Sequence, residues 1–155
     1  MARRPAVVVA TALVVSVVGW QVVESRRTAD PVDVSRYPAP AAATSRPCAQ
    51  FAAALPDSLG SLDRRPVLAD HVGWTAYGEP AVVVRCGGSA STRYRPGDQM
   101  ISINDVAWYA DESRAGGVDF SLPRSIVNVS VWIPSAYRAD LLSALSGAVL
   151  AAQPL

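Results

Sequence analysis

Apolar side chains fill residues 6–23 almost without interruption, and this run predicts the first element of the chain. Only Thr11, Ser16 and Gln21 break it. As an α-helix, a run of this length spans about 27 Å, close to the roughly 30 Å hydrocarbon core of a bilayer. The segment therefore predicts a single-pass transmembrane helix, an N-terminal anchor within residues 1–23.

A cleavable signal peptide is the alternative for this segment. Signal peptides end in a small-x-small cleavage site, whereas residues 19–24 are Gly-Trp-Gln-Val-Val-Glu, and no cysteine for lipid attachment comes directly after the apolar run. Pro5 comes directly after Arg3 and Arg4, where a twin-arginine signal requires apolar residues. We therefore expect an uncleaved anchor, with its short N-terminus in the cytoplasm and the remaining chain outside the cell membrane.

The pattern changes after the apolar run. Residues 24–46 contain Pro31, Pro38 and Pro40 and no sustained apolar period, which predicts a flexible linker. Residues 47–155 carry regular apolar periods, and a segment of this length can bury a core of its own. The sequence therefore predicts three parts: an anchor, a linker and one extracytoplasmic domain.

Two segments of the domain have the apolar spacing of amphipathic helices. The first is predicted to end before Pro56, and its apolar face consists of Cys48, Phe51, Ala52 and Leu55. The second is predicted to start near Pro134 and Ser135, and its buried stripe consists of Leu141, Leu145, Ala148 and Ala152.

Strands are predicted where apolar residues alternate or form short β-branched runs. These segments are residues 67–76, 81–85, 99–103, 106–110 and 125–133. Asn104 and Asp105 join two of them as a hairpin turn, because both residues tolerate positive φ. The polar segments 57–66 and 111–122 are predicted loops. The resulting fold class is α+β, a two-layer domain with an antiparallel sheet of four to five strands and both helices on one face.

Composition excludes several classes of function. The formal net charge of +1 gives no reason to expect a nucleic-acid partner, although all 14 basic residues are arginine. One histidine and two cysteines far apart in the sequence do not form a zinc site, which needs several closely spaced ligands. We therefore expect no metal and no cofactor.

The two cysteines, Cys48 and Cys86, both follow the predicted anchor. In an oxidising compartment they predict a disulfide, and a chain with only two cysteines has one intramolecular connectivity. The bond would staple the first helix to the end of the strand at residues 81–85. Two buried free thiols are the alternative, because unpaired cysteine is also commonly buried.

The stretch from residue 74 to residue 87 combines aromatic, charged and turn-forming residues more densely than any other. Its candidate binding surface consists of Trp74, Tyr77, Glu79 and Arg85. Aromatic residues beside a strand are more commonly part of a core, so a structural role for the same side chains is the alternative.

Residues 77–87, Tyr-Gly-Glu-Pro-Ala-Val-Val-Val-Arg-Cys-Gly, also carry a resemblance. They are similar to the signature of an uncharacterised family of actinobacterial secreted or membrane-anchored proteins, a domain of unknown function with a Trp-Gly-Asp-Pro turn leading into Leu-Arg-Cys-Gly. Tyr77, Glu79 and Asp105 depart from the usual residues of that family. The resemblance covers residues 46–153 and implies a compartment and a fold, but no activity.

Two functional hypotheses remain. The first is a non-catalytic interaction module, held at the outer face of the membrane and docking a protein or polymer of the cell envelope. The second is a small extracytoplasmic hydrolase. It would use His71 with Asp70 and a loop serine, or carboxylates such as Glu79 and Asp105, but the chain has no Gly-x-Ser-x-Gly motif to support a serine mechanism.

Overall fold

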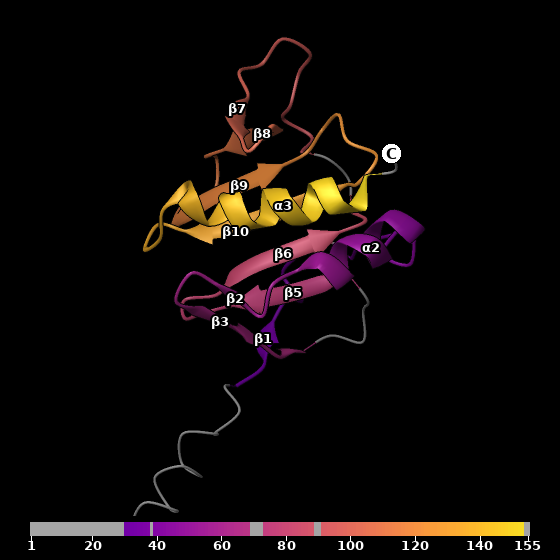
Figure 1. Cartoon of the computed structure of the whole chain (residues 1–155). Coiled ribbons are helices and arrows are strands. Elements are labelled where there is room, and N and C mark those ends of the chain that lie inside the picture. The colour runs from indigo at the N-terminus through magenta and orange to yellow at the C-terminus, as the bar shows by residue number, and fades with distance from the viewer. Residues whose placement is uncertain (1–29, 38, 69–72, 89–90, 154–155) are drawn as a thin grey trace, which may run out of the picture.

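The computed structural model describes residues 30–37, 39–68, 73–88 and 91–153 (Figure 1). The predicted anchor within residues 1–23 lies outside these ranges. Among the described residues, no helix is both long enough and apolar enough to cross a membrane.

One large antiparallel sheet forms the centre of the fold. Across the described residues it has eight strands, in the spatial order β2 (Ser58–Leu59), β3 (Leu62–Arg65), β5 (Trp74–Tyr77), β6 (Val82–Cys86), β10 (Val129–Pro134), β9 (Gly117–Ser121), β8 (Val106–Asp111) and β7 (Ile101–Ile103). All neighbouring pairs in it are antiparallel. A separate, parallel pair consists of β1 (Val32–Asp33) and β4 (Val67–Leu68).

The amino-acid sequence of β6 explains its central position. Val82, Val83 and Val84 are all buried, and successive side chains of a strand point to opposite faces of the sheet. Val82 and Val84 therefore belong to the core beneath the helices, whereas Val83 packs with Trp132 on the other face. A strand that is apolar on both sides needs a covering layer on each side.

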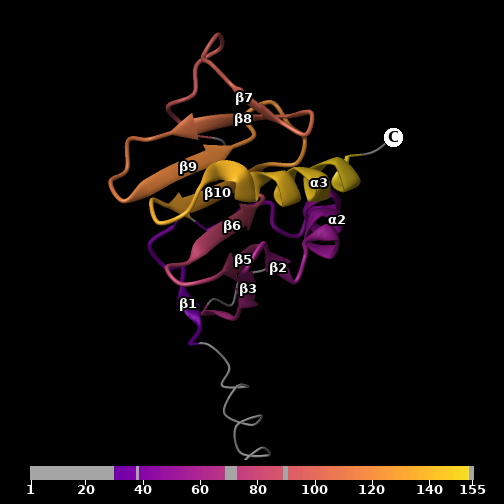
Figure 2. The same cartoon turned by 60° about the vertical axis from the view of Figure 1, so that its left-hand side comes forward.

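Both helices cover the same face, as predicted. They are α2 (Arg46–Ala54) and α3 (Leu142–Ala152), and the short 3₁₀ helix η1 (Ala139–Leu141) leads into the second. The predicted start of the second helix near Pro134 is wrong, because Pro134 is the last residue of β10. Phe51 and Leu145 from these helices share one buried cluster with Val84 of β6. Figure 2 shows α2 and α3 side by side along this face of the sheet.

The opposite face is covered by the segment that precedes α2. Val32 and Val34 are buried there against Val83 and Trp132. This segment falls within residues 24–46, predicted above as a flexible linker. Its described part belongs to the fold instead, because two valines spaced two residues apart can both point into the sheet.

The predicted sheet of four to five strands is too small. Residues 57–66, predicted as a loop, form the β2–β3 hairpin, in which Gly60 makes the turn with a φ of 61°. Residues 111–122, also predicted as a loop, contain β9. Strand β9 is hard to recognise because its apolar–polar alternation is short and directly follows an acidic, Gly-containing segment. The predicted hairpin turn is confirmed, since Asn104 and Asp105 have φ values of 48° and 62°.

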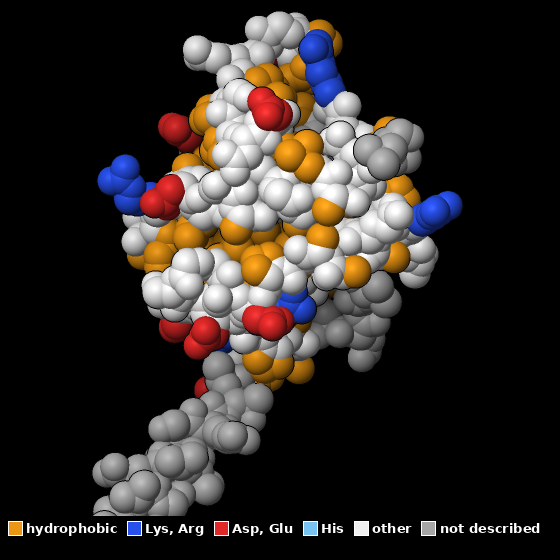
Figure 3. Space-filling model, viewed as in Figure 1, with side chains coloured by type: hydrophobic (Ala, Val, Ile, Leu, Met, Phe, Trp, Pro, Cys, Tyr) orange, Lys and Arg blue, Asp and Glu red, His pale blue; other side chains and the backbone are white. Residues whose placement is uncertain are grey.

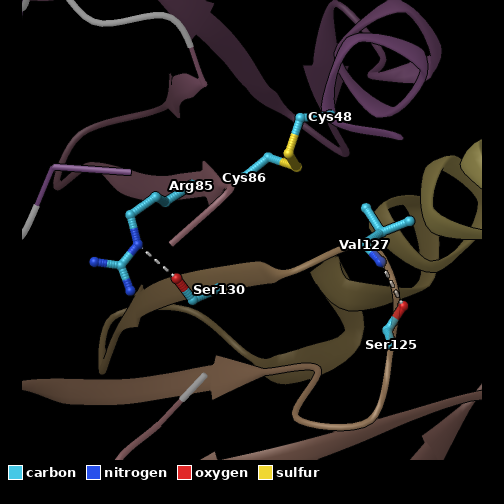
Figure 4. Close-up of a disulfide and its surroundings, with 6 residues drawn as sticks. All are labelled: Cys48, Arg85, Cys86, Ser125, Val127 and Ser130. Carbon is cyan, nitrogen blue, oxygen red and sulfur yellow. Dashed lines mark hydrogen bonds between the residues drawn. A yellow bond between two sulfur atoms is a disulfide. The ribbon is translucent and has the colours of Figure 1, made fainter. Parts of the chain in front are cut away.

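The predicted disulfide is present: Cys48 and Cys86 are bonded, with their Cα atoms 5.6 Å apart (Figure 4). Cys48 lies in α2 and Cys86 is the last residue of β6. Both cysteines are buried. The bond therefore fixes one helix of the covering layer to the central strand.

Removing this bond tests its contribution to stability. The cysteines are 38 residues apart in the sequence, and closing a loop of this length stabilises a fold by about 4 kcal/mol in the chain-entropy model. We expect the double variant C48A/C86A to lose about that much free energy of unfolding in urea. Wild-type protein treated with a reducing agent is the matched comparison, and a loss below about 1 kcal/mol in both would contradict the prediction.

Candidate binding site

A row of polar side chains crosses the face of the sheet that lies away from the helices. Arg85 is in register with Ser130, and Ser130 is in register with Ser121. In the next row, Asp119 is in register with Asp111 on the neighbouring strand. Directly opposed residues of neighbouring strands share a face, and so do residues two apart in one strand. These five side chains therefore lie on one surface.

A cavity of about 620 Å³ lies over this surface. Strands β6, β8, β9 and β10 supply its floor, and the segment before α2 contributes Arg36, Tyr37 and Ala42 to its wall. Small-molecule sites typically have volumes of roughly 300–1,000 Å³. The cavity is therefore large enough for a small organic ligand.

Three arginines line the cavity: Arg36, Arg85 and Arg114. In the view of the face that carries the helices, the visible basic side chains stand apart from one another (Figure 3). The three arginines at the cavity instead line one common space.

Arg85 is held at the floor by contacts to two strands. Its Nε donates a hydrogen bond to Ser130 Oγ at 2.9 Å (Figure 4), and its guanidinium carbon lies 5.9 Å from the centre of the Trp74 ring. Burial lowers the pKa of Arg85, while the charge of Asp119 acts in the opposite direction. Arginine nevertheless stays protonated in proteins, so the cavity contains a permanent, half-buried positive charge.

Arg114 is held by aromatic rings. Its guanidinium carbon lies 4.2 Å from the centre of the Trp132 ring and 4.9 Å from that of Tyr37. Arg36 also lies over Tyr37, at 5.3 Å. Such cation–π contacts each contribute about 0.5–2 kcal/mol. The faces of the Tyr37 and Trp132 rings therefore hold guanidinium groups. The N–H edges of these guanidinium groups are the part that can bind an anion.

Two carboxylates line the same cavity, and their environments differ. Burial raises the pKa of Asp119, although Arg114 and Arg85 act to lower it. Burial also acts to raise the pKa of Asp111, but hydrogen bonds outweigh it, and the pKa lies below its ordinary value. Those bonds come from the backbone N–H of Ser113 at 3.0 Å and from Ser91 Oγ at 3.2 Å.

Two hydroxyl groups at the cavity lack partners in the described part of the chain. Ser121 is only 3% exposed, and neither its Oγ nor the buried Tyr37 hydroxyl has a hydrogen-bond partner there. Both residues line the cavity. Because a buried hydroxyl without a partner is costly, a ligand that supplies one would gain affinity.

The wall formed by the segment before α2 is fixed to the end of β6. Gly87 accepts a hydrogen bond from the N–H of Ala42 at 2.9 Å and donates one to the carbonyl of Asn128 at 2.8 Å. Gly87 has a φ of 88°, and a Cβ atom there would collide with the backbone of Ala42 and Ala43. Glycine is therefore required next to Cys86, where the wall meets the floor.

The structure brings together only two of the four predicted surface residues. Trp74 and Arg85 are in register on neighbouring strands and in contact. Tyr77 is completely buried on the helix face, where its hydroxyl donates to the carbonyl of Pro56 at 2.8 Å. Glu79 is 76% exposed and forms an ion pair with Arg65 outside the cavity.

Of the described residues considered for catalysis, neither Glu79 nor Asp105 lines the cavity. Asp70 and His71 lie outside the described residues, and Asp105 occupies the β7–β8 turn. No group of three or more His, Cys, Asp or Glu side chains that could hold a metal ion occurs in the described ranges.

The sequence interpretation missed most of the cavity residues, among them Arg36, Arg114, Asp119 and Ser121. Arg36 was placed in the linker and the others in a loop. The only signal for Asp119 and Ser121 is their spacing of two residues around Phe120, which is the period of a strand.

Comparison with known proteins gives one match. The sequence profile of the family described as "Protein of unknown function (DUF3515)" matches residues 7–155. The resemblance to an uncharacterised family is thereby confirmed. No curated protein and no solved structure matches.

Replacing each of the two carboxylates by a neutral amide should change the free energy of unfolding in opposite directions. Because the pKa of Asp119 is raised, its ionised form disfavours the folded state, and Asp119→Asn should increase the free energy of unfolding near neutral pH. That gain should disappear below about pH 3.8, the ordinary value, where the carboxyl is protonated in both the folded and the unfolded chain. Urea unfolding at several pH values measures it.

Asp111→Asn is the matched control. The pKa of Asp111 is lowered, so its ionised form stabilises the folded state near neutral pH, and this contribution is lost as the pH falls through the folded-state pKa. We expect this variant to be less stable than wild type near neutral pH. Stability changes of the same sign in both variants would show that the two environments do not differ in this way.

Proposed function

We propose a function for this chain, which belongs to the DUF3515 family of proteins of unknown function. The chain is a module that binds a small ligand with an oxyanion group outside the cell membrane. The observation that carries this proposal is the half-buried guanidinium of Arg85 on the floor of a 620 Å³ cavity that also holds Arg36 and Arg114. Guanidinium groups recognise carboxylates and phosphates through paired N–H donors.

The location of the module is also a proposal. The apolar length of residues 6–23 supports a single-pass membrane anchor. The Cys48–Cys86 bond supports an extracytoplasmic position, because disulfides persist in oxidising compartments. On this basis the ligand is a component of the bacterial cell envelope, either free or part of an envelope protein or polymer.

A hydrolase is the second candidate, and one observation favours it. Asp111 and Asp119 oppose each other on neighbouring strands within the cavity, and their environments move the two pKa values apart. Such a pair can divide the roles of general acid and general base. If so, a panel of chromogenic esters and glycosides would include a substrate whose turnover is lost in both Asp111→Asn and Asp119→Asn.

The binding proposal is tested with a pair of probes that differ in one charge. N-acetylalanine carries a carboxylate, and N-acetylalaninamide has the same body without it. We expect the full chain in detergent micelles to bind the first at least about tenfold more tightly, a difference of about 1.4 kcal/mol. Arg114→Gln should remove most of this difference, as measured by calorimetry or by NMR chemical-shift titration.

Arg46→Gln is the matched control for that experiment, because Arg46 is an exposed residue of α2 and does not line the cavity. It should leave both affinities unchanged. Equal affinity of wild type for the two probes, or equal losses in the Arg46 and Arg114 variants, would refute the oxyanion site.

The location is tested by topology. A reporter that is active only outside the cytoplasm, fused after Leu155, should be active in cells, because the anchor is expected to place the C-terminal domain there. A reporter active only in the cytoplasm would reverse this orientation. Deleting residues 1–23 should release the fusion from the membrane fraction.

A further inference from the structure

The half-buried charges of the cavity alternate in sign. The charges of Arg114 and Arg85 both act on Asp119, and Asp111 follows on the next strand. These two arginines and two aspartates balance to zero, while Arg36 and Arg93 are exposed at the edge. Exposed charges are screened by water and salt more strongly than half-buried ones. The inner part of the cavity is therefore close to neutral. It has a basic pole, Arg85 and Arg114, and an acidic pole, Asp119 and Asp111.

The acidic pole has unused capacity. The Asp119 carboxylate makes no hydrogen bond and no ion pair within the described part of the chain, although it is half-buried. Each Asp111 oxygen accepts one hydrogen bond, from Ser113 or from Ser91, and Oδ2 also lies 3.7 Å from Nε of the exposed Arg93. A carboxylate oxygen can accept two hydrogen bonds. Both aspartates can therefore accept from a donor on a ligand, and a cationic donor fits best.

The basic pole lies on the other side of Asp119. Arg85 is on β6, two strands from β9 and three from β8, and neighbouring strands lie about 4.8 Å apart. The backbone of Arg85 is therefore roughly 10–14 Å from the backbones of the two aspartates. Arg114 comes from the connection between β8 and β9 and reaches over Trp132, which is in register with Asp119. Ser121, whose Oγ has no partner in the described part of the chain, is on β9, between the strands of Arg85 and Asp111. A ligand that contacts both poles needs opposite charges separated by a short polar body.

We infer that the cavity binds a zwitterion, an amino acid or a short peptide with a free amine and a free carboxylate. Its carboxylate lies at Arg85 and Arg114, and its ammonium lies at Asp119 and Asp111. This inference rests on the proposed oxyanion site and adds the second charge of the ligand. A purely anionic ligand would engage Arg85 and Arg114 but would leave the half-buried Asp119 carboxylate without a hydrogen bond, and a dianion such as phosphate would leave the inner cavity with a net negative charge.

Four forms of one dipeptide test both charges separately. They are Ala-Ala with both ends free, N-acetyl-Ala-Ala, Ala-Ala-amide and N-acetyl-Ala-Ala-amide. We expect the full chain in detergent micelles to bind the free dipeptide most tightly, with a loss of at least about tenfold on blocking either end. In Asp119→Asn, acetylation should change the affinity by less than about twofold, while amidation should still weaken binding. In Arg114→Gln, amidation should change the affinity by less than about twofold, while acetylation should still weaken binding.

The outcomes separate this inference from the proposed function. If N-acetyl-Ala-Ala binds as tightly as the free dipeptide while the amide binds weakly, the oxyanion site stands and the zwitterion is wrong. If the amide binds as tightly as the free dipeptide, the proposed function fails as well. If none of the four binds at about 10 mM, the inference is overturned. Urea unfolding of each variant establishes that it is folded.

Discussion

Three consecutive valines in β6 point alternately to the two faces of the sheet, so both faces at its centre have to be shielded from water. Two helices shield one face, and the disulfide holds the first of them to β6. The other face has no helix among the described residues. A short extended segment with Val32 and Val34 covers part of it, and the cavity lies where this thin cover ends.

The two faces of the sheet are covered differently, and the position of the cavity follows from this difference. On the helix face, the residues of β9 and β10 that point inward are apolar, for example Phe120 and Val131. On the other face the same strands carry Asp119 and Ser130. Burying Arg85 there costs desolvation energy, and contacts with Trp74 and Ser130 offset part of it. A fold that only needed a closed core would fill this space with apolar side chains, so the retained charges are consistent with a site.

Local patterns in the sequence were sufficient for much of the fold. Both helices, β6, the turn at Asn104 and Asp105, and the disulfide could be predicted because each depends on neighbouring residues or on the number of cysteines. The β2–β3 hairpin was missed because each of its strands contains a single apolar residue, Leu59 or Leu62, and β9 was missed because its apolar–polar alternation is short. The cavity could not be predicted, since it depends on register: Arg85 and Asp119 are far apart in the sequence and meet through β10.

The order of the sheet also bears on self-association. An open sheet exposes the unpaired backbone groups of its two outer strands, which can recruit the edge of another molecule. Here those strands are β2 and β7, with only two and three residues. So short an edge offers a second copy too few backbone hydrogen bonds for continuous pairing, and the long central strands are protected from fibre-like stacking. The brevity of the outermost strands thus helps each copy to remain separate when many are crowded together.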